Sequence, residues 1–188
     1  LFVCDPLDLA ALHPIADDIS AAVLTLGAGD TGDLVALRDK QNDGFTPVAR
    51  GADDLAAILY TSGTTGRSKG AMLTHRALAS NSAVLKDYWH FDSNDVLIHA
   101  LPIFHTHGLF VATNIALMAG GSCIFMEKFD AAAICAAMPK ATALMGVPTF
   151  YTRLLKQPDL AQASQNMRLF VSGSAPLLAE THEQWFQV

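Results

Sequence analysis

Residues 60–70 bring hydroxyl, glycine and cationic side chains together in one short stretch, Tyr-Thr-Ser-Gly-Thr-Thr-Gly-Arg-Ser-Lys-Gly. Its glycines let the backbone turn tightly and bring N–H groups against an anion, while the hydroxyls and the two cations add side-chain donors and positive charge. These residue types suit a polyphosphate. The Walker A motif needs Lys directly after its second glycine. Here Arg67 and Ser68 follow Gly66, so the spacing is not that of Walker A. The same composition is also typical of an ordinary loop, so both interpretations stay open.

Residues 104–108 read Phe-His-Thr-His-Gly and follow an apolar run at residues 96–101. Two histidines in an H-x-H arrangement, with His99 nearby, suggest a zinc site. No Cys, Asp or Glu lies within the loop to complete the ligand set, so the sequence does not predict a metal there. Histidines that are hydrogen-bonded within a loop are the ordinary alternative.

Two further stretches carry candidate chemistry. Residues 145–153, Met-Gly-Val-Pro-Thr-Phe-Tyr-Thr-Arg, end in Arg153; a helical Arg usually points to solvent, but its guanidinium also suits a bidentate clamp on a carboxylate. Residues 172–176, Ser-Gly-Ser-Ala-Pro, do not fit the G-x-S-x-G elbow of serine hydrolases, because position 172 is Ser. A strand-to-helix turn with Ser174 as N-cap is the simpler interpretation.

A rival motif lies at residues 27–32, which match G-x-G-x-x-G between a predicted strand at 21–26 and a predicted helix at 33–39. A dinucleotide site also needs an acidic residue at the carboxyl end of the following strand. Asp53 and Asp54 stand before that strand, at its wrong end. The sequence therefore favours an ordinary turn with Thr31 or Asp33 as N-cap.

The elements that must position these residues alternate along the chain. Strands are predicted at 1–3, 21–26, 55–60, 96–101, 142–145 and 168–171, and helices at 7–20, 33–39, 72–88, 131–138, 148–155 and from about 177. Within the 72–88 pattern Thr74 is predicted as the N-cap of a helix over 77–88, and Asp130 is predicted to cap the helix at 131–138. This alternation predicts an α/β fold of mostly parallel sheets with crossover helices on both faces. The loops after Tyr60, Leu101, Met145 and Val171 would then lie at carboxyl ends of strands, where open sheets bind ligands, and we expect them to form one site.

Composition and charge bound the function. With 51% hydrophobic and 16% charged residues the chain is globular, and a net charge of -6 without a Lys/Arg stripe argues against a nucleic-acid partner. The apolar residues 108–126 are broken at Gly120 and Gly121, which favours a buried helix and strand over a membrane span. Cys4, Cys123 and Cys135 read as free thiols, so we expect a reducing, cytoplasmic location. No signal peptide is visible, and both ends suggest a piece of a longer protein.

The stretch at 60–70 closely resembles the phosphate-binding signature of the AMP-forming acyl-CoA synthetases and adenylation domains, Y-T-S-G-T-T-G-x-P-K-G, with Ser68 where Pro is common. Most of the remaining chain also resembles this family, and among its members the malonyl-CoA synthetases most closely. The resemblance implies a truncated piece of the large N-terminal domain of an adenylate-forming enzyme: residues 1–188 as a partial AMP-binding domain, with 1–40 a peripheral α/β piece, 41–52 a connector and 53–188 the core. The C-terminal domain would be absent.

The resemblance also implies roles for individual residues. The phosphates of ATP would be held by Thr61, Ser62, Gly63, Thr64, Thr65, Gly66 and Lys69. The adenine and acyl group would lie along Ser174, Ala175 and Pro176. His107, which Gly108 follows, would border the acyl carboxylate and the α-phosphate, and Arg153 would hold the distal carboxylate of malonate with a further donor from Ser172. His107, Lys69 and Thr64 would act in catalysis, and no metal ligand is assigned.

The implied activity is that of an acid-thiol ligase using ATP, Mg2+ and CoA. It would convert malonate to malonyl-AMP and transfer the acyl group to CoA, with small molecules as partners and neither nucleic acid nor membrane. The family's remaining motifs would lie beyond Val188, so the isolated chain is expected to be inactive. Another acid such as methylmalonate, a non-catalytic ATP-binding module and a dinucleotide-binding domain stay open as alternatives.

Overall fold

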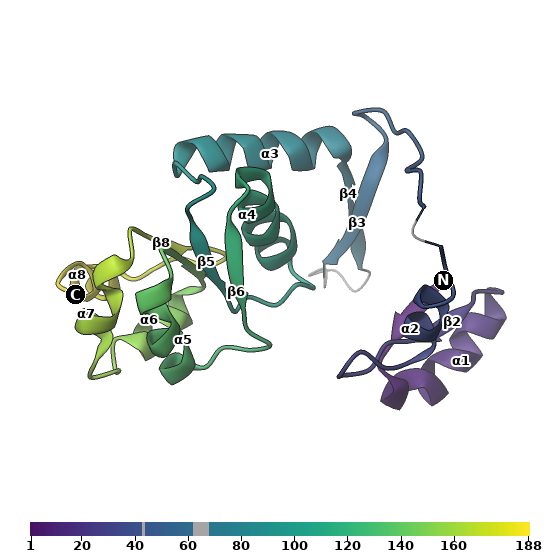
Figure 1. Ribbon diagram of the computed structural model, residues 1–188, viewed down its shortest axis with the longest axis horizontal. Coiled ribbons are helices and arrows are strands. Elements are labelled where there is room, and N and C mark those ends of the chain that lie inside the picture. The colour runs from purple at the N-terminus through teal and green to yellow at the C-terminus, as the bar shows by residue number, and fades with distance from the viewer. Residues whose placement is uncertain (43, 62–67) are drawn as a thin grey trace. The chain divides into compact units, whose positions relative to one another are not determined.

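The chain forms two compact units, Leu1–Ala49 and Arg50–Val188. The computed structural model describes residues 1–42, 44–61 and 68–188 (Figure 1). The boundary between the units falls inside the stretch 41–52 for which a connector is predicted.

The first unit is a small α/β piece. Strands β1 (Phe2–Cys4) and β2 (Val23–Thr25) pair in parallel, and α1 (Leu9–Asp18), preceded by the short helix η1 (Pro6–Asp8), connects them. Helix α2 (Asp33–Arg38) follows β2.

Hydrogen bonds hold the glycine-rich turn at residues 27–32, before α2. The Gly27 N–H donates to the Thr31 carbonyl at 2.8 Å, and the Asp33 N–H donates to the Thr25 hydroxyl at 3.0 Å. The residue at the N-cap position is Gly32, so the predicted caps at Thr31 and Asp33 are wrong. The reason is that the hydroxyl of Thr25, eight residues away in β2, accepts the first helical N–H instead.

A β-hairpin opens the second unit. Strand β3 (Leu55–Thr61) pairs antiparallel with β4 (Lys69–Thr74), with Tyr60 opposite Gly70. The expectation of a loop between a strand and a helix is therefore wrong, because residues 69–74 are a strand. Adjacent apolar residues at 72 and 73 fit a helix and a short strand equally well, and only pairing with β3 decides between them.

Helix α3 (His75–Tyr88) follows β4 directly. Its N-cap is Thr74, whose hydroxyl accepts a hydrogen bond from the Ala77 N–H at 3.2 Å, as the sequence predicts.

The main sheet has four parallel strands in the order β6-β5-β7-β8. These strands are β5 (Val96–His99), β6 (Ser122–Phe125), β7 (Ala143–Gly146) and β8 (Leu169–Ser172). The connecting helices are η2 (His107–Thr113), α4 (Asn114–Ala119), α5 (Ala131–Ala137), η3 (Met138–Lys140), α6 (Pro148–Leu154), α7 (Leu160–Ala163) and η4 (Ser164–Asn166), and α8 (Ala179–Phe186) comes last. The predicted cap Asp130 is confirmed, since it accepts from the Ala133 N–H at 2.9 Å.

The strand order places helices on both faces of this sheet. From β5 the chain moves outward to β6, then passes β5 to reach β7 and β8 on the other side. Right-handed crossovers in opposite directions put α4 on one face and α5 and α6 on the other, and Figure 1 shows α4 beside α3 and α5 beside α6. The α/β prediction of mostly parallel sheets with helices on both faces is confirmed, and the β3–β4 hairpin is the exception.

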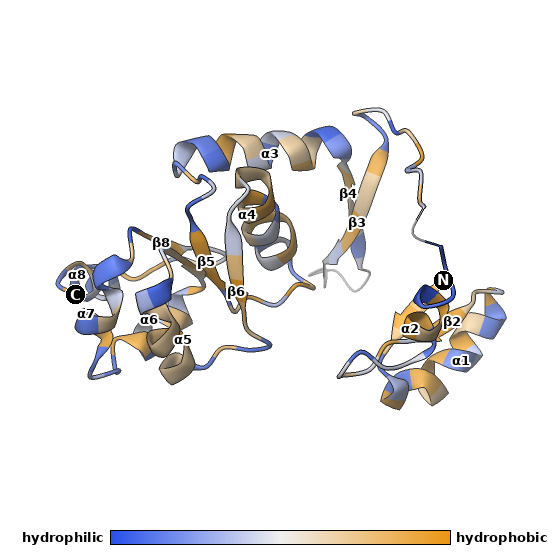
Figure 2. Ribbon diagram, in the orientation of Figure 1, coloured by the Kyte–Doolittle hydropathy of each residue, from blue (hydrophilic) through white to orange (hydrophobic). Residues whose placement is uncertain are grey.

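The core of the second unit lies around the central strands. Leu97 and Ile98 in β5 and Leu144 and Met145 in β7 have no exposed side-chain surface, and Figure 2 shows the hydrophobic colour along β5. Apolar strands buried on both faces are typical of parallel sheets. Among the residues described, no helix is both long and apolar enough to cross a bilayer.

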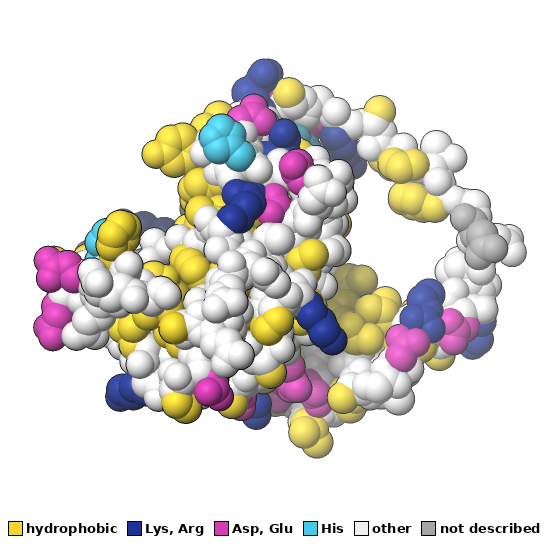
Figure 3. Space-filling model, turned by 60° about the vertical axis from the view of Figure 1, so that its left-hand side comes forward, with side chains coloured by type: hydrophobic (Ala, Val, Ile, Leu, Met, Phe, Trp, Pro, Cys, Tyr) yellow, Lys and Arg dark blue, Asp and Glu magenta, His cyan; other side chains and the backbone are white. Residues whose placement is uncertain are grey.

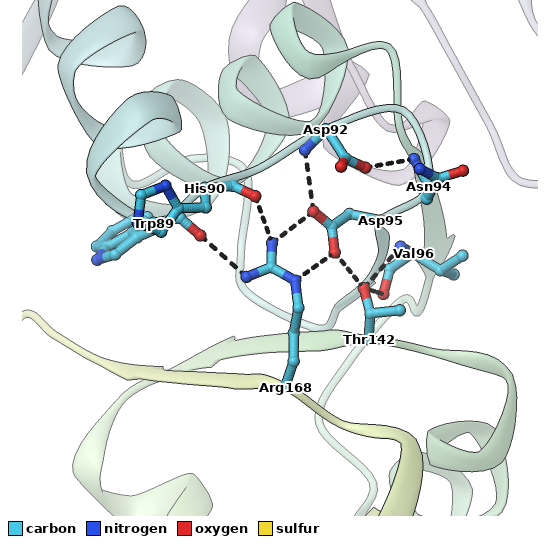
Figure 4. A network of polar contacts seen from close by, with 8 residues as sticks. All are labelled: Trp89, His90, Asp92, Asn94, Asp95, Val96, Thr142 and Arg168. Atoms are coloured by element: carbon cyan, nitrogen blue, oxygen red, sulfur yellow. Dashed lines mark hydrogen bonds and ion pairs between the residues drawn. The ribbon is translucent and has the colours of Figure 1, made fainter.

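Polar contacts join the strands at the amino end of this sheet (Figure 4). Asp95, which precedes β5, accepts hydrogen bonds from Arg168 Nε at 2.8 Å and from Thr142 Oγ1 at 2.6 Å, while Arg168 also donates to the Trp89 carbonyl at 2.9 Å. Burial of Asp95 opposes its ionisation, but the hydrogen bonds from Arg168 and Thr142 outweigh it and lower the pKa of Asp95 to about 2. These contacts connect three strands and the end of α3.

Candidate functional site

A pocket of about 460 Å³ lies where the loops after β5, β7 and β8 come together. The loop after β5 supplies most of its lining and the loops after β7 and β8 supply one residue each; the lining residues are Leu101, Pro102, His105, Thr106, His107, Gly108, Val147 and Ser174. Neighbouring strands β5 and β7 lead to helices on opposite faces, so the pocket lies at the switch point where open α/β sheets bind ligands.

His107 and Ser174 form the polar centre of this pocket. The His107 Nδ1 lies 3.1 Å from the Ser174 hydroxyl, although 67 positions separate the two residues in the sequence. A Cβ added to Gly173 would lie 2.9 Å from His107 Cε1, so a glycine is needed for the ring to approach this closely. Ser174 itself has a φ of 67°, a left-handed conformation that is uncommon for residues other than glycine and is frequent at functional sites.

The environment of His107 favours its neutral form. Burial, together with the nearby His99, lowers the pKa of His107 below its ordinary value. A neutral imidazole carries one N–H. When the Ser174 hydroxyl donates to Nδ1, the proton is on Nε2, which is then a donor for an anionic oxygen in the pocket.

The helix that begins at His107 is unusual. Helix η2 has the wide π form over its seven residues, and such single-turn segments are rare and frequent at functional sites. A Cβ on Gly108 would lie 2.3 Å from the Pro102 carbonyl oxygen, so this glycine lets the helix start against the preceding loop.

The other predicted residues of the 172–176 segment lie beside the pocket. Ser172 ends β8 opposite Gly146, and its hydroxyl is buried with no hydrogen-bond partner among the described residues. Ala175 and Pro176 follow Ser174 and are exposed. Of this segment, only Ser174 lines the pocket.

Arg153 lies apart from these groups, on helix α6. Its side chain is exposed, and its guanidinium carbon is 4.4 Å from the centroid of the Phe129 ring. The Phe129 ring in turn lies 4.2 Å from that of Phe150. Arg153 is not among the residues that line the pocket, although Val147, the N-cap of the same helix, is.

The predicted phosphate loop can be followed only in part. Lys69 opens β4 opposite Thr61, while Ser62, Gly63, Thr64, Thr65 and Gly66 lie outside the described residues. The pocket lining includes no residue of the hairpin strands. The described residues thus join His107 to Ser174 and leave the expected grouping of all four loops a prediction.

A zinc site at the histidine loop finds no support in the described part of the chain, where no group of three His, Cys, Asp or Glu side chains could hold a metal. The His99 Nε2 lies 2.9 Å from the Gly108 carbonyl oxygen instead. On the face drawn in Figure 3, cationic and anionic side chains are interspersed.

Sequence reasoning assigned no role to His99 beyond a possible metal site. The signal was present, since this polar ring closes an otherwise apolar strand, Val-Leu-Ile-His. Its side chain is 1% exposed and stacks on the Phe125 ring with centroids 4.7 Å apart.

Comparisons with known proteins agree with this fold. The family model described as AMP-binding enzyme matches residues 2–188. A crystal structure of ATP-bound MatB from Rhodopseudomonas palustris superposes with a TM-score of 0.95 at 59% identity, over 98% of this chain and 37% of that chain. A malonyl-CoA ligase complex with methylmalonyl-CoA and AMP gives a TM-score of 0.75 at 35% identity, over 92% of this chain and 40% of that chain.

Curated relatives point the same way. The malonate–CoA ligase of Arabidopsis thaliana is 35% identical over 82% of this chain and 29% of its own length. The mitochondrial malonate–CoA ligase of Mus musculus is 38% identical over 69% of this chain and 25% of its own length. The chain thus spans about a third or less of the length of these curated relatives.

Proposed function

Because this chain belongs to the AMP-binding enzyme family, we propose that it forms part of the N-terminal AMP-binding domain of an AMP-forming acid:CoA ligase. We propose malonate, or a close short dicarboxylic acid, as its acid. The observation that carries the proposal is the His107–Ser174 pair in a pocket at the switch point of the sheet.

The reaction has two steps. A carboxylate oxygen of malonate attacks the α-phosphorus of ATP, and the bond to pyrophosphate breaks, giving malonyl-AMP. The sulfur of CoA then attacks the acyl carbonyl, its proton passes to solvent, and AMP leaves with the electrons of the acyl–oxygen bond. Both steps depend on holding two anions together, so positioning and local donors supply most of the catalysis.

His107 would act at the reacting carboxylate and the α-phosphate. Its lowered pKa keeps the ring neutral near pH 7, so it can offer one N–H to oxygens that gain charge without adding a permanent charge of its own. The hydroxyl of Ser174 fixes which ring nitrogen faces the substrate.

Residues of the hairpin would hold the β- and γ-phosphates. Lys69 stands at the start of β4, and its charge suits the leaving pyrophosphate. Mg2+ bound together with ATP would offset the charge of the phosphates.

Arg153 would select the dicarboxylic acid. Val147 lines the pocket at the start of α6, and Arg153 lies further along the same helix. The role of Arg153 rests on the resemblance of residues 145–153 to the malonyl-CoA synthetases. The Phe129 ring under Arg153 limits its rotamers. A monocarboxylic acid would leave Arg153 without this partner.

Acid-dependent ATP–pyrophosphate exchange by the complete protein tests the proposal. We expect exchange with malonate or methylmalonate, at least about tenfold less with acetate, and a loss of about 100-fold in the His107→Gln variant. Equal exchange with acetate would refute the dicarboxylic substrate. ATP binding without exchange for any acid would refute the ligase assignment and leave a nucleotide-binding module.

We also propose a cytoplasmic location. Cys4, Cys123 and Cys135 are all free thiols in the structure, which suits a reducing compartment. The Mus musculus relative above is named as a mitochondrial protein, so fractionation of cells that express the complete protein decides between the two locations.

A further inference from the structure

A buried histidine supports the helix that carries His107. His99 closes strand β5, is 1% exposed and stacks on Phe125, its register partner in β6. Its Nε2 lies 2.9 Å from the Gly108 carbonyl oxygen and 3.1 Å from the Thr113 hydroxyl. Because a carbonyl oxygen can only accept, the proton of this contact is on His99 Nε2.

The Gly108 carbonyl is held by two side chains at once. The Thr113 hydroxyl donates to the same oxygen at 2.9 Å, so His99 and Thr113 both bind the first turn of η2 from the side. The backbone at Gly108 also approaches the Pro102 carbonyl so closely that a Cβ would lie at 2.3 Å. The start of the π-helix is therefore in contact both with the end of β5 and with the preceding loop.

The position of His107 follows from this arrangement. Its backbone adjoins Gly108, and its ring reaches the Ser174 hydroxyl 3.1 Å away on a different loop. A shift of η2 by even about 1 Å would break that contact, and misplacements of this size cost about 100-fold in rate at a site that depends on positioning.

We propose that His99 is a positioning residue of the acid-activation site: its N–H anchors the Gly108 carbonyl and thereby holds the His107 imidazole against Ser174. The inference rests on the proposed function, in which His107 faces the reacting carboxylate. A histidine that only fills the core would need its volume and its stacking on Phe125, whereas this role needs the Nε2–H. The two roles are separable by substitution.

Two variants of the complete protein make that separation. His99→Phe keeps an aromatic ring against Phe125 but removes the donor; His99→Gln keeps a donor at a similar reach and removes the ring. In malonate-dependent exchange we expect kcat to fall about 100-fold in His99→Phe with little change in KM for ATP, and His99→Gln to stay within several-fold of wild type. Equal losses in both variants, or a loss only in His99→Gln, would show a packing role and overturn the proposal.

An activity-independent measurement accompanies the kinetics. The His107 ring signals are assigned in NMR spectra of histidine-labelled protein by their absence in His107→Gln, and their titration is followed. Both variants remove the His99 ring that helps to lower the pKa of His107, so we expect its titration midpoint to rise in both. We expect a further rise toward the midpoint of a free imidazole in His99→Phe alone, because only there does the His107 ring leave its buried position. An equal rise in folded His99→Phe and His99→Gln contradicts the proposal.

The exchange assay and the NMR titration test different claims. If wild type shows no exchange with any acid, the proposed function fails, while the His107 titration still decides whether His99 positions that ring. If His99→Phe does not fold, Thr113→Val removes the second donor to Gly108 without touching β5. We expect it to shift the His107 titration and kcat in the same directions by smaller amounts, and no change in either would overturn the anchoring role.

Discussion

The parallel sheet carries the pocket with His107, and the β3–β4 hairpin flanks the predicted phosphate loop, on very different supports. In the sheet, Leu97 and Leu144 have no exposed surface, whereas in the hairpin Tyr60 and Met72 are 74% and 73% exposed. The pocket with His107 is thus built on a buried core, while the strands flanking the predicted phosphate loop are held mainly by their own backbone ladder. If the proposed function holds, substitutions around the pocket should affect stability and acid recognition together, and substitutions in the hairpin should affect nucleotide recognition with little change in stability.

The largest effect should come from cavities. Leu144→Ala in β7 should lower the free energy of unfolding by about 3 kcal/mol, because it removes a fully buried side chain. Met72→Ala in β4 should change it by less than about 0.5 kcal/mol, because that side chain is already in contact with water. Urea unfolding of both variants measures this; similar losses would show that the hairpin is part of the same core.

A buried and an exposed ion pair should also differ in how much they contribute to stability. Asp95→Asn should cost about 2–3 kcal/mol, because Asp95 is 4% exposed, and the amide removes the charge that pairs with Arg168 and replaces one of the two acceptor oxygens by an NH2 group facing other donors. The matched control is Asp53→Asn, which breaks an exposed pair with Arg76 and should leave the urea midpoint nearly unchanged.

The Asp95 contribution has a defined pH window. With a folded pKa of about 2, below its unfolded value near 4, it is fully present above about pH 4 and is lost as the pH falls toward 2. Unfolding of wild type and Asp95→Asn should therefore converge at acid pH, and a constant difference would contradict this account.

Two glycine substitutions test how closely the backbone packs against its neighbours. Gly108→Ala should destabilise the protein by about 2 kcal/mol, because the new methyl group would meet the Pro102 backbone at 2.3 Å. In Gly70→Ala the nearest atom is a methyl group of the Ile58 side chain at 2.7 Å, which can rotate away, so the cost should be smaller. Thermal unfolding of the two variants measures this. A larger loss of stability in Gly70→Ala than in Gly108→Ala would show that the surroundings of Gly70 are the more rigid.

The smallest expected effect concerns His107. Its pKa is lowered in the folded protein, so stability is complete above the unfolded pKa of about 6.5 and declines as the pH falls below it. His107→Gln should flatten the decline between pH 7 and 5 without changing stability at pH 8. Parallel pH profiles for wild type and variant would show that His107 is solvated as in the unfolded chain.

Local rules predicted much of the second unit. The caps Thr74 and Asp130 were found because a hydroxyl or carboxylate directly before an apolar helical pattern has few other roles. The sheet was found because apolar runs alternate with helices. The hairpin was missed because β4 is short and mostly exposed, so its strand state depends on pairing with β3 and not on its own pattern.

The sequence predicted which loops form the candidate site, but not which of their side chains are in contact. The α/β pattern implies that loops at the carboxyl ends of parallel strands lie together, and His107 and Ser174 line one pocket. The contact of His99 with the Gly108 carbonyl is made at the start of η2, whose π form no sequence periodicity reveals. Arg153 was assigned by resemblance alone, and its stacking on Phe129 could not be foreseen because it joins two separate helical connections.

The central claim, a malonate-activating ligase, is tested most directly by the acid preference of Arg153→Ala in the complete protein. The ratio of kcat/KM for malonate to that for acetate should fall about 100-fold, because only malonate presents a second carboxylate to the guanidinium. Lys156→Ala, which removes an exposed cation close by in the chain, should leave the ratio unchanged. An unchanged ratio in Arg153→Ala would contradict the assignment of malonate.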